Sequence, residues 1–328
     1  MEYAPVIIKT LNRYDHLRQC IESLQKNKGA EFTDIYISVD YPPSEKYREG
    51  YLKVRKYTEQ GITGFHKVHI FYHEKNIGSH ENTKFLIKEA EKDFDTYIFT
   101  EDDNVFSPCF LTYVNECLEK YADDENIFAI CGYSYPVEWE RDGVIIKNTC
   151  LFPAWGYATW INRRKQLLQF SKEDIQQYMR RFHNAHFLYK KNRHLFIEAV
   201  NIARNNHYLA LNDQKKLKHI DCVMGLYLTM RDKYSLMPIV SMVRNIGCDG
   251  SGLNCAKITD SRKVNAKEYD FSRQLIDERE EFHLNDYEIV PISQSELKKL
   301  DQFMVTSFQD RLKAWVIWTL LYFRLLKA

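Results

Sequence analysis

Short apolar runs alternate with amphipathic stretches through the first hundred residues of the chain. Four such runs predict buried strands, at residues 6–8, 35–39, 68–72 and 97–100. The stretches between them carry apolar side chains at helical spacing, at residues 16–26, 47–57 and 79–92. Strands that alternate with helices are typical of a parallel sheet with right-handed crossovers. The pattern therefore predicts an α/β fold, with a mostly parallel sheet flanked by helices.

Each of these strands is followed by polar side chains that can bind a ligand. In chain order they are Thr10, Asn12 and Arg13, then Asp40, then His73, Glu74, Lys75 and Asn76, then Glu101, Asp102 and Asp103. The carboxyl ends of parallel strands meet at one edge of a sheet, where open α/β folds bind their ligands. Hydrogen-bonding groups, cations and clustered carboxylates at one edge suit a nucleotide diphosphate with a divalent metal.

The three consecutive carboxylates at residues 101–103 repel one another unless a cation or hydrogen-bond donors compensate. Mg²⁺ and Mn²⁺ prefer oxygen ligands and are commonly held by one or two carboxylates plus substrate phosphates. We therefore expect a Mn²⁺ or Mg²⁺ site, with Asp103 as the direct ligand and Glu101 as a second candidate that could instead support the loop. A solvated acidic turn is the alternative, and the polar ends of the other strands argue against it.

Composition narrows the class of protein. With 328 residues, 45% of them hydrophobic, the chain can form one large domain or a domain with an appended piece. A net charge of +1 gives no reason to expect nucleic acid as a partner. The eight cysteines form no CxxC pair, and the start of the chain lacks a signal-peptide pattern, so a cytoplasmic location with free thiols is expected. The absence of GxGxxG and GxxxxGK[ST] makes a dinucleotide dehydrogenase or a P-loop kinase a poor fit.

Several segments resemble those of GT-A glycosyltransferases, in particular bacterial family 2-like enzymes and the related inverting N-acetylglucosaminyltransferase type. In chain order, these segments are residues 4–13, 38–40, 101–103, 152–157, 219–221 and 238–252. The first two resemble the base-binding strand and the second-strand aspartate, and the third resembles the DxD motif. The resemblance implies a catalytic domain at 1–256, with a nucleotide-binding half at about 1–107 and an acceptor half at about 108–256. Residues 257–328 are expected to form a connector and an amphipathic helix.

The resemblance implies a metal-dependent, inverting hexosyl- or N-acetylhexosaminyltransferase. Such an enzyme would move a sugar from a nucleotide diphosphate, most naturally UDP, to a saccharide or lipid-linked acceptor in surface polysaccharide or glycolipid assembly. Asp102 would order the ribose or a metal-bound water, and Asp40 would accept hydrogen bonds from the base or ribose. The full set expected to bind the nucleotide sugar is Thr10, Asn12, Arg13, Asp40, Lys75, Asn76, Asp102, Trp155 and Gly156.

Two aspartates are candidates for the catalytic base. Asp221 opens an apolar helical run, so it could act as a general base on the acceptor hydroxyl or only cap the helix. Asp249 is the second candidate. Trp155, beside Gly156, could pack against the apolar face of a sugar ring, or simply belong to the core.

The second half of the chain has a basic segment and an apolar end. Residues 163–193 are rich in Arg, Lys and aromatic side chains without a nucleic-acid-binding motif, so we expect no nucleic acid. The uncharged run 314–323 is too short to span a bilayer. Its Trp and Tyr residues and flanking cations predict an in-plane anchor on the inner face of the cell membrane. Docking on the body of the protein, or on a second copy in a homodimer, is the alternative.

Two other functions compete with sugar transfer. A sugar-1-phosphate nucleotidyltransferase would use a similar sheet, but it needs a Gly-rich phosphate loop after the first strand, and residues 10–13 contain no glycine. A non-catalytic, membrane-tethered carbohydrate-binding scaffold would use the basic aromatic segment instead. Binding of nucleotide that depends on metal would separate the transferase from the scaffold.

Overall fold

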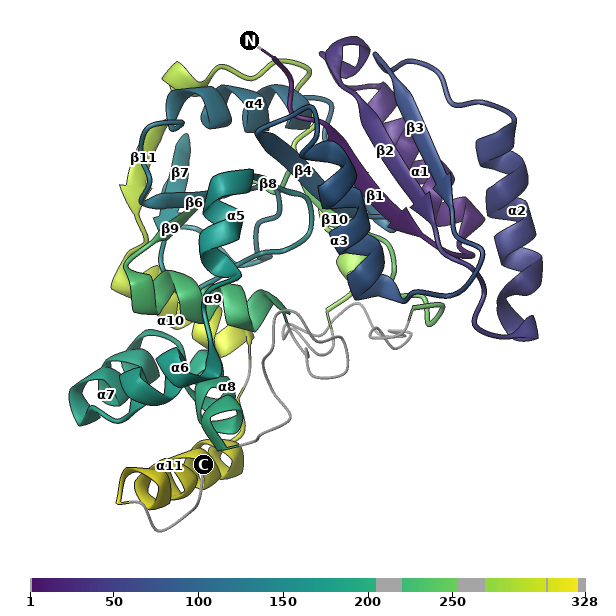
Figure 1. The fold of residues 1–328 in the computed structure, drawn as a ribbon. Helices are drawn as coiled ribbons and strands as arrows, with labels where there is room; N and C mark the ends of the chain where they lie inside the picture. Colours follow the sequence, from purple (N-terminus) through teal and green to yellow (C-terminus); the bar gives the residue numbers. More distant parts are fainter. Residues whose placement is uncertain (1, 205–219, 253–268, 305, 324–328) are drawn as a thin grey trace.

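The computed structural model describes residues 2–204, 220–252, 269–304 and 306–323 (Figure 1). Within these residues a nine-stranded mixed sheet has the order β11-β7-β9-β6-β8-β4-β1-β2-β3. Its strands are β1 (Val6–Thr10), β2 (Ile35–Val39), β3 (Val68–Tyr72), β4 (Thr96–Glu101), β6 (Ile127–Cys131), β7 (Val144–Asn148), β8 (Tyr157–Trp160), β9 (Tyr234–Pro238) and β11 (Glu288–Pro291). A separate antiparallel pair consists of β5 (Asn104–Phe106) and β10 (Val243–Asn245).

The four predicted strands β1 to β4 are adjacent and parallel, so the predicted α/β fold, which is GT-A-like, is confirmed. In this register Thr10 lies beside Val39, and Lys9 lies beside Glu101. The carboxyl ends of β1, β2 and β4 therefore meet at one edge of the sheet, as the sequence predicted.

Helices cover both faces of the sheet. They are α1 (Tyr14–Gln25), α2 (Arg48–Glu59), α3 (Ser79–Ala90), α4 (Phe110–Lys120), α5 (Ile161–Leu167), α6 (Lys172–Met179), α7 (Phe182–Lys191), α8 (Arg193–Arg204), α9 (Ile220–Arg231), α10 (Gln294–Phe303) and α11 (Phe308–Tyr322). Short 3-10 helices occur at Ala30–Phe32, Glu45–Tyr47, Phe271–Arg273 and Leu284–Asp286. Alternate side chains of β1 point to opposite faces: Val6 and Ile8 join the core under α1, α2 and α4, and Ile7 joins the core that contains α3.

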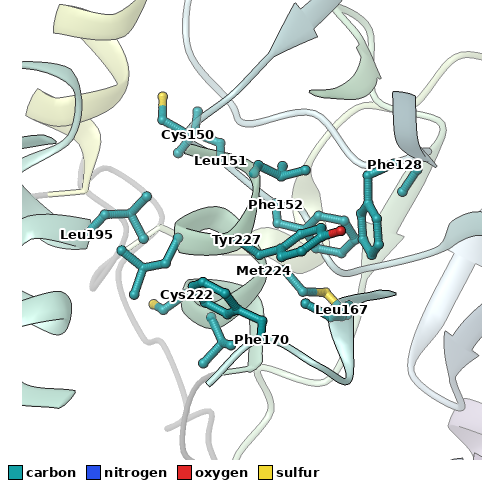
Figure 2. Packing of buried hydrophobic residues seen from close by; sticks show 14 of the residues in the cluster. Phe128, Cys150, Leu151, Phe152, Leu167, Phe170, Leu195, Cys222, Met224 and Tyr227 are labelled. Atoms are coloured by element: carbon teal, nitrogen blue, oxygen red, sulfur yellow. The ribbon is translucent and has the colours of Figure 1, made fainter. Parts of the chain in front are cut away.

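The second half of the chain packs its helices on the sheet through aromatic side chains. Tyr227 of α9 lies between Phe128 of β6 and Phe170, with ring centroids 5.3 Å and 5.6 Å away (Figure 2). Leu195 of α8 belongs to the same cluster. These contacts fix α9, and with it Asp221 in its first turn, against the sheet.

The C-terminal segment contributes to the body of the protein. Strand β11 pairs in parallel with β7, so part of the expected connector extends the sheet. Helix α11 docks with Ala314, Ile317 and Trp318 buried, and the Trp318 indole N–H donates a hydrogen bond to the Met179 carbonyl over 2.8 Å. One side of this helix therefore takes the docked position that the sequence left open. In the described part of the chain, no helix combines the length and apolar character needed to cross a membrane.

Candidate functional site

The carboxylate cluster lies where β4 ends and turns into β5. Asp102 and Asp103 are only 3% and 7% exposed, so both need compensating partners. The Thr10 hydroxyl donates to Asp102 Oδ2 over 2.7 Å, which links the end of β1 to this turn. Pairing of β5 with β10 fixes the turn from the other side, and the Ile246 amide donates to the Asp103 carbonyl over 2.8 Å.

Arg13 bridges the two aspartates from the start of α1. Its guanidinium is hydrogen-bonded to Asp102, and its Nη1 lies 2.8 Å from Asp103 Oδ2. On the opposite side, Asn245 Nδ2 donates to Asp103 Oδ1 over 2.9 Å. Lys9 pairs separately with Glu101, at 2.8 Å between Nζ and Oε1. The cluster formed by these described side chains thus holds three carboxylates against two cations, which leaves an excess negative charge.

The electrostatic cost of this excess falls on Asp103. Burial, with the nearby charge of Glu101 added, raises the pKa of Asp103 to about 7, although Arg13 acts in the opposite direction. In contrast, the ion pair with Lys9 lowers the pKa of Glu101. Asp103 is therefore the carboxylate that would gain most from an added cation.

This cluster could hold a divalent cation only if the bound substrate supplied further oxygen atoms. Among the described residues, no group of three or more His, Cys, Asp and Glu side chains could hold a metal ion. A single carboxylate is nevertheless sufficient for Mg²⁺ or Mn²⁺ when substrate phosphates supply further oxygens. Glycine at 247 lets the following loop pack closely against Asp103, because a Cβ atom there would lie 2.2 Å from Asp103 Oδ2. Because Glu101 is engaged by Lys9, Asp103 is the principal candidate ligand.

Asp40 is surrounded by hydrogen-bond donors of its own loop and the next. Its carboxylate accepts hydrogen bonds from the amides of Tyr41, Ile77 and Gly78 and from Asn76 Nδ2, over 2.8–3.0 Å. These donors use the roughly four acceptor positions of a carboxylate. Asp40 and Asn76 therefore hold loop 76–78 at the start of α3, and the contacts to a base, ribose or phosphate expected of them stay predictions.

Asn12 and Lys75 were also predicted to bind the nucleotide sugar. Among the described residues, no hydrogen bond joins either side chain to the carboxylate cluster. Asn12 packs its backbone against α2, where a Cβ atom at Gly50 would lie 2.3 Å from the Asn12 carbonyl oxygen. Lys75 is exposed and lines a hollow of about 480 Å³ along α3, together with Lys84 and Lys88.

Trp155 lies in an aromatic group before β8. Its ring packs edge-on against Tyr133 and Phe271, with centroids 4.7 Å and 5.1 Å away. Gly156 adopts a φ of +64°, and a Cβ atom there would lie 2.8 Å from Val243 Cγ2, so a larger residue would displace β10. The half-buried Trp155 keeps an aromatic surface close to the strand that carries Asn245.

The two candidate bases occupy different positions. Asp249 follows Gly247 in the loop that lies against Asp103, and its Oδ2 is 3.3 Å from His16 Nε2. Asp221 is exposed in the first turn of α9, and its charge contributes to a raised pKa of the half-buried Tyr135, after the larger effect of desolvation. No hydrogen bond or ion pair joins Asp221 to the carboxylate cluster in the described part of the chain. The neighbouring His219 lies outside the described residues.

Two residues of the cluster were not among the predicted site residues. Lys9 becomes recognisable once β1 and β4 are known to be neighbours, because their register places it beside Glu101. Asn245 reaches Asp103 from 142 positions further along the chain, through a strand of only three residues. A short strand gives little local signal, so the sequence placed Asn245 only within the segment 238–252 that resembles the family and gave it no role.

Solved structures with some similarity to this chain share little sequence with it. Staphylococcus aureus TarS is 14% identical over 43% of this chain, which spans 24% of TarS, with a TM-score of 0.29. The mannosyltransferase PcManGT from Pyrobaculum calidifontis, in complex with GDP-Man and Mn²⁺, is 11% identical over 70% of this chain and 69% of its own, with a TM-score of 0.41. HddC from Yersinia pseudotuberculosis is 11% identical over 50% of this chain and 78% of its own, with a TM-score of 0.31.

No curated protein sequence matches the chain. The sequence profile of glycosyl transferase family 2, in contrast, matches residues 6–196. This region contains β1 to β4, the carboxylate cluster and Trp155. Because the matched region makes up more than half of the chain, the protein belongs to glycosyl transferase family 2.

Proposed function

We propose that this enzyme is a metal-dependent, inverting hexosyl- or N-acetylhexosaminyltransferase that uses a nucleotide diphosphate sugar such as a UDP-sugar. The acceptor is a saccharide or a lipid-linked saccharide. The observation that carries the proposal is the buried Asp102–Asp103 pair at the carboxyl edge of β1 and β4, in a cluster where three carboxylates face two cations. Mn²⁺ or Mg²⁺, when bound, would neutralise the leaving diphosphate as a Lewis acid.

The residues of the site have distinct roles in this proposal. Asp103 holds the cation, and Asp102, fixed by Thr10 and Arg13, orders the ribose. Asp221 or Asp249 removes the proton from the acceptor hydroxyl as it attacks the anomeric carbon. Trp155 offers its ring to the apolar face of the sugar. Family membership favours this reaction over nucleotidyl transfer and over a non-catalytic scaffold.

The metal role is tested with Asp103→Asn, which keeps the shape of the side chain and removes its charge. We expect calorimetry with UDP and Mn²⁺ to show binding to the parent protein and a loss of the metal-dependent part in the variant. Asp123→Asn, an exposed aspartate in another loop, serves as the control and should bind like the parent. Unchanged metal-dependent binding in Asp103→Asn would remove Asp103 from the site.

The base is identified by comparing Asp221→Asn with Asp249→Asn. Loss of a general base lowers turnover by about 10²–10⁴-fold and leaves donor binding intact. Turnover is measured with a panel of nucleotide sugars, and the anomeric configuration of the product by NMR. If both variants turn over normally, neither aspartate is the base, and a retained configuration would contradict inversion.

A further inference from the structure

Helix α11 is apolar on two opposite sides, and its neighbours cover only one of them. Its outward residues Phe308, Leu312, Val316 and Phe323 are 70%, 54%, 51% and 63% exposed. Their spacing of about four and seven residues places them on one face of the helix. The opposite face, with Trp318, is packed on the body. A helix that is hydrophobic all round is normally buried, whereas the outward face of α11 has no partner among the described residues.

Helix α7 lies beside α11 and adds positive charge to the same end of the molecule (Figure 1). The Phe182 ring is 5.8 Å from that of Trp318, which shows that the two helices are neighbours. Phe182 and Phe187 are exposed, as are Arg180, Arg181 and Lys190. No Asp or Glu occurs between residues 175 and 197. We call these exposed side chains of α7 and α11, together with Arg180 and Arg181, the outer helical surface.

We propose that the outer helical surface rests on an anionic lipid bilayer, with α11 lying in the plane of the membrane. Apolar and aromatic side chains would enter the interface while the cations meet anionic headgroups. The uncharged run 314–323 is too short to cross the hydrocarbon core. A second copy of the chain suits this surface less well, because a two-fold contact would bring identical cations together. The inference does not depend on the metal or base assigned above.

The test is flotation of the full chain with vesicles of phosphatidylcholine, with and without about one-third phosphatidylglycerol. We expect binding to the anionic vesicles that weakens at high salt. The double variant Leu312→Glu/Val316→Glu should lower the partition coefficient at least about tenfold, because it charges the inserted face. The triple variant Arg180→Gln/Arg181→Gln/Lys190→Gln should lower it by a similar factor for anionic vesicles only. The matched control is Leu52→Glu on α2, because Leu52 is 50% exposed and the change is chemically the same.

Because all substituted side chains are exposed, we expect each variant to fold, and circular dichroism melts verify this. Equal flotation of the double variant and the Leu52→Glu control would overturn the proposal. The proposal would also be overturned if the parent protein failed to bind vesicles and sedimented as a dimer while the double variant sedimented as a monomer. In that case the surface is an interface between two copies.

Discussion

Two adjacent aspartates acquire different properties at the end of β4. Asp102 is satisfied by Thr10 and Arg13, and Asp103 shares the same guanidinium while facing the charge of Glu101. Because Arg13 already occupies Asp103 Oδ2, it competes for this oxygen with any added cation. Arg13 therefore stabilises the metal-free protein and, under the proposed metal role of Asp103, would compete with the cation for this oxygen.

Replacement of Arg13 by Gln should expose this competition. Loss of the guanidinium leaves two buried carboxylates without their shared cation, which costs about 3 kcal/mol of unfolding free energy in metal-free buffer. Mn²⁺ should then raise the melting temperature of Arg13→Gln more than that of the parent, because the cation binds a freed oxygen. Thermal unfolding with and without Mn²⁺ measures both effects. Arg18→Gln, on the exposed side of α1, is the control, and equal Mn²⁺ shifts in both variants would contradict the competition.

Asp40 allows a second test at the residue scale. In Asp40→Asn, the amide nitrogen would face one of the four donors that now point at the carboxylate, which should cost about 2 kcal/mol. Hydrogen exchange should accelerate at the amides of Ile77 and Gly78. A fall in nucleotide affinity without any change in stability or exchange would instead assign Asp40 to direct binding of the nucleotide.

At the scale of elements, the strands of the first hundred residues were predictable from the sequence and the long-range contacts were not. Apolar runs of about five residues, each followed by polar side chains, are sufficient to indicate β1 to β4 and their shared edge. Strands β5 and β10 have three residues each, and β11 has four in a charged segment. Such strands are defined by their partners elsewhere in the chain, which local periodicity does not identify.

For helix α11, the sequence predicts the helix but not which of its sides packs on the body of the protein. Trp315 and Trp318 face the body, and Leu312 and Val316 face outward. A sequence with apolar residues on both sides predicts a helix but not which side is packed. The sequence therefore left membrane anchoring and docking as alternatives, and the structure shows that docking uses one side and leaves the other exposed.

The cap of α10 gives a prediction at the scale of an element. Ser293 caps this helix and Glu296 completes a capping box, while Arg141 pairs with the buried Glu296 at 2.6 Å. Burial acts to raise the pKa of Glu296, but hydrogen bonds from Ser293 and Arg141 outweigh it and lower the pKa. The resulting stabilisation is thus present above the unfolded pKa of about 4.3 and is lost as the pH falls through the lower folded value.

Glu296→Gln should therefore cost about 2 kcal/mol at neutral pH and progressively less in acid. Urea unfolding between pH 3 and pH 7, approximately, measures the difference. Ser293→Ala, which removes a neutral cap, should cost about 1 kcal/mol with little dependence on pH. A cost for Glu296→Gln that stays constant across this range would contradict the charge-dependent cap.

At the scale of the whole molecule, the two ends of the chain share one hydrophobic core. Ile7 of β1 and the buried face of α11, with Ile317 and Trp318, belong to the same continuous cluster. Strand β11 forms one edge of the sheet and β3 the other. The C-terminal segment is therefore part of the unit that positions the site, and loss of its contacts should be felt throughout the fold.

Trp318 tests this continuity. It is 6% exposed, packs 5.3 Å from Trp315 and donates to the Met179 carbonyl, so Trp318→Ala should lower the free energy of unfolding by about 3–5 kcal/mol. Trp318→Phe keeps most of the buried area but loses the hydrogen bond, and should cost about 1–2 kcal/mol. Val316→Ala, on the exposed side of the same helix, should cost about 0.5 kcal/mol or less.

Urea unfolding followed by far-UV circular dichroism measures the global cost of each variant, and hydrogen exchange in α8 and β1 locates it. Because the core is continuous, Trp318→Ala should accelerate exchange in the slowest amides of both elements, since these open only when the whole unit unfolds. If α11 instead detached independently, exchange would accelerate in α11 and α8 while β1 kept its full protection. That result would separate the C-terminal helix from the catalytic core.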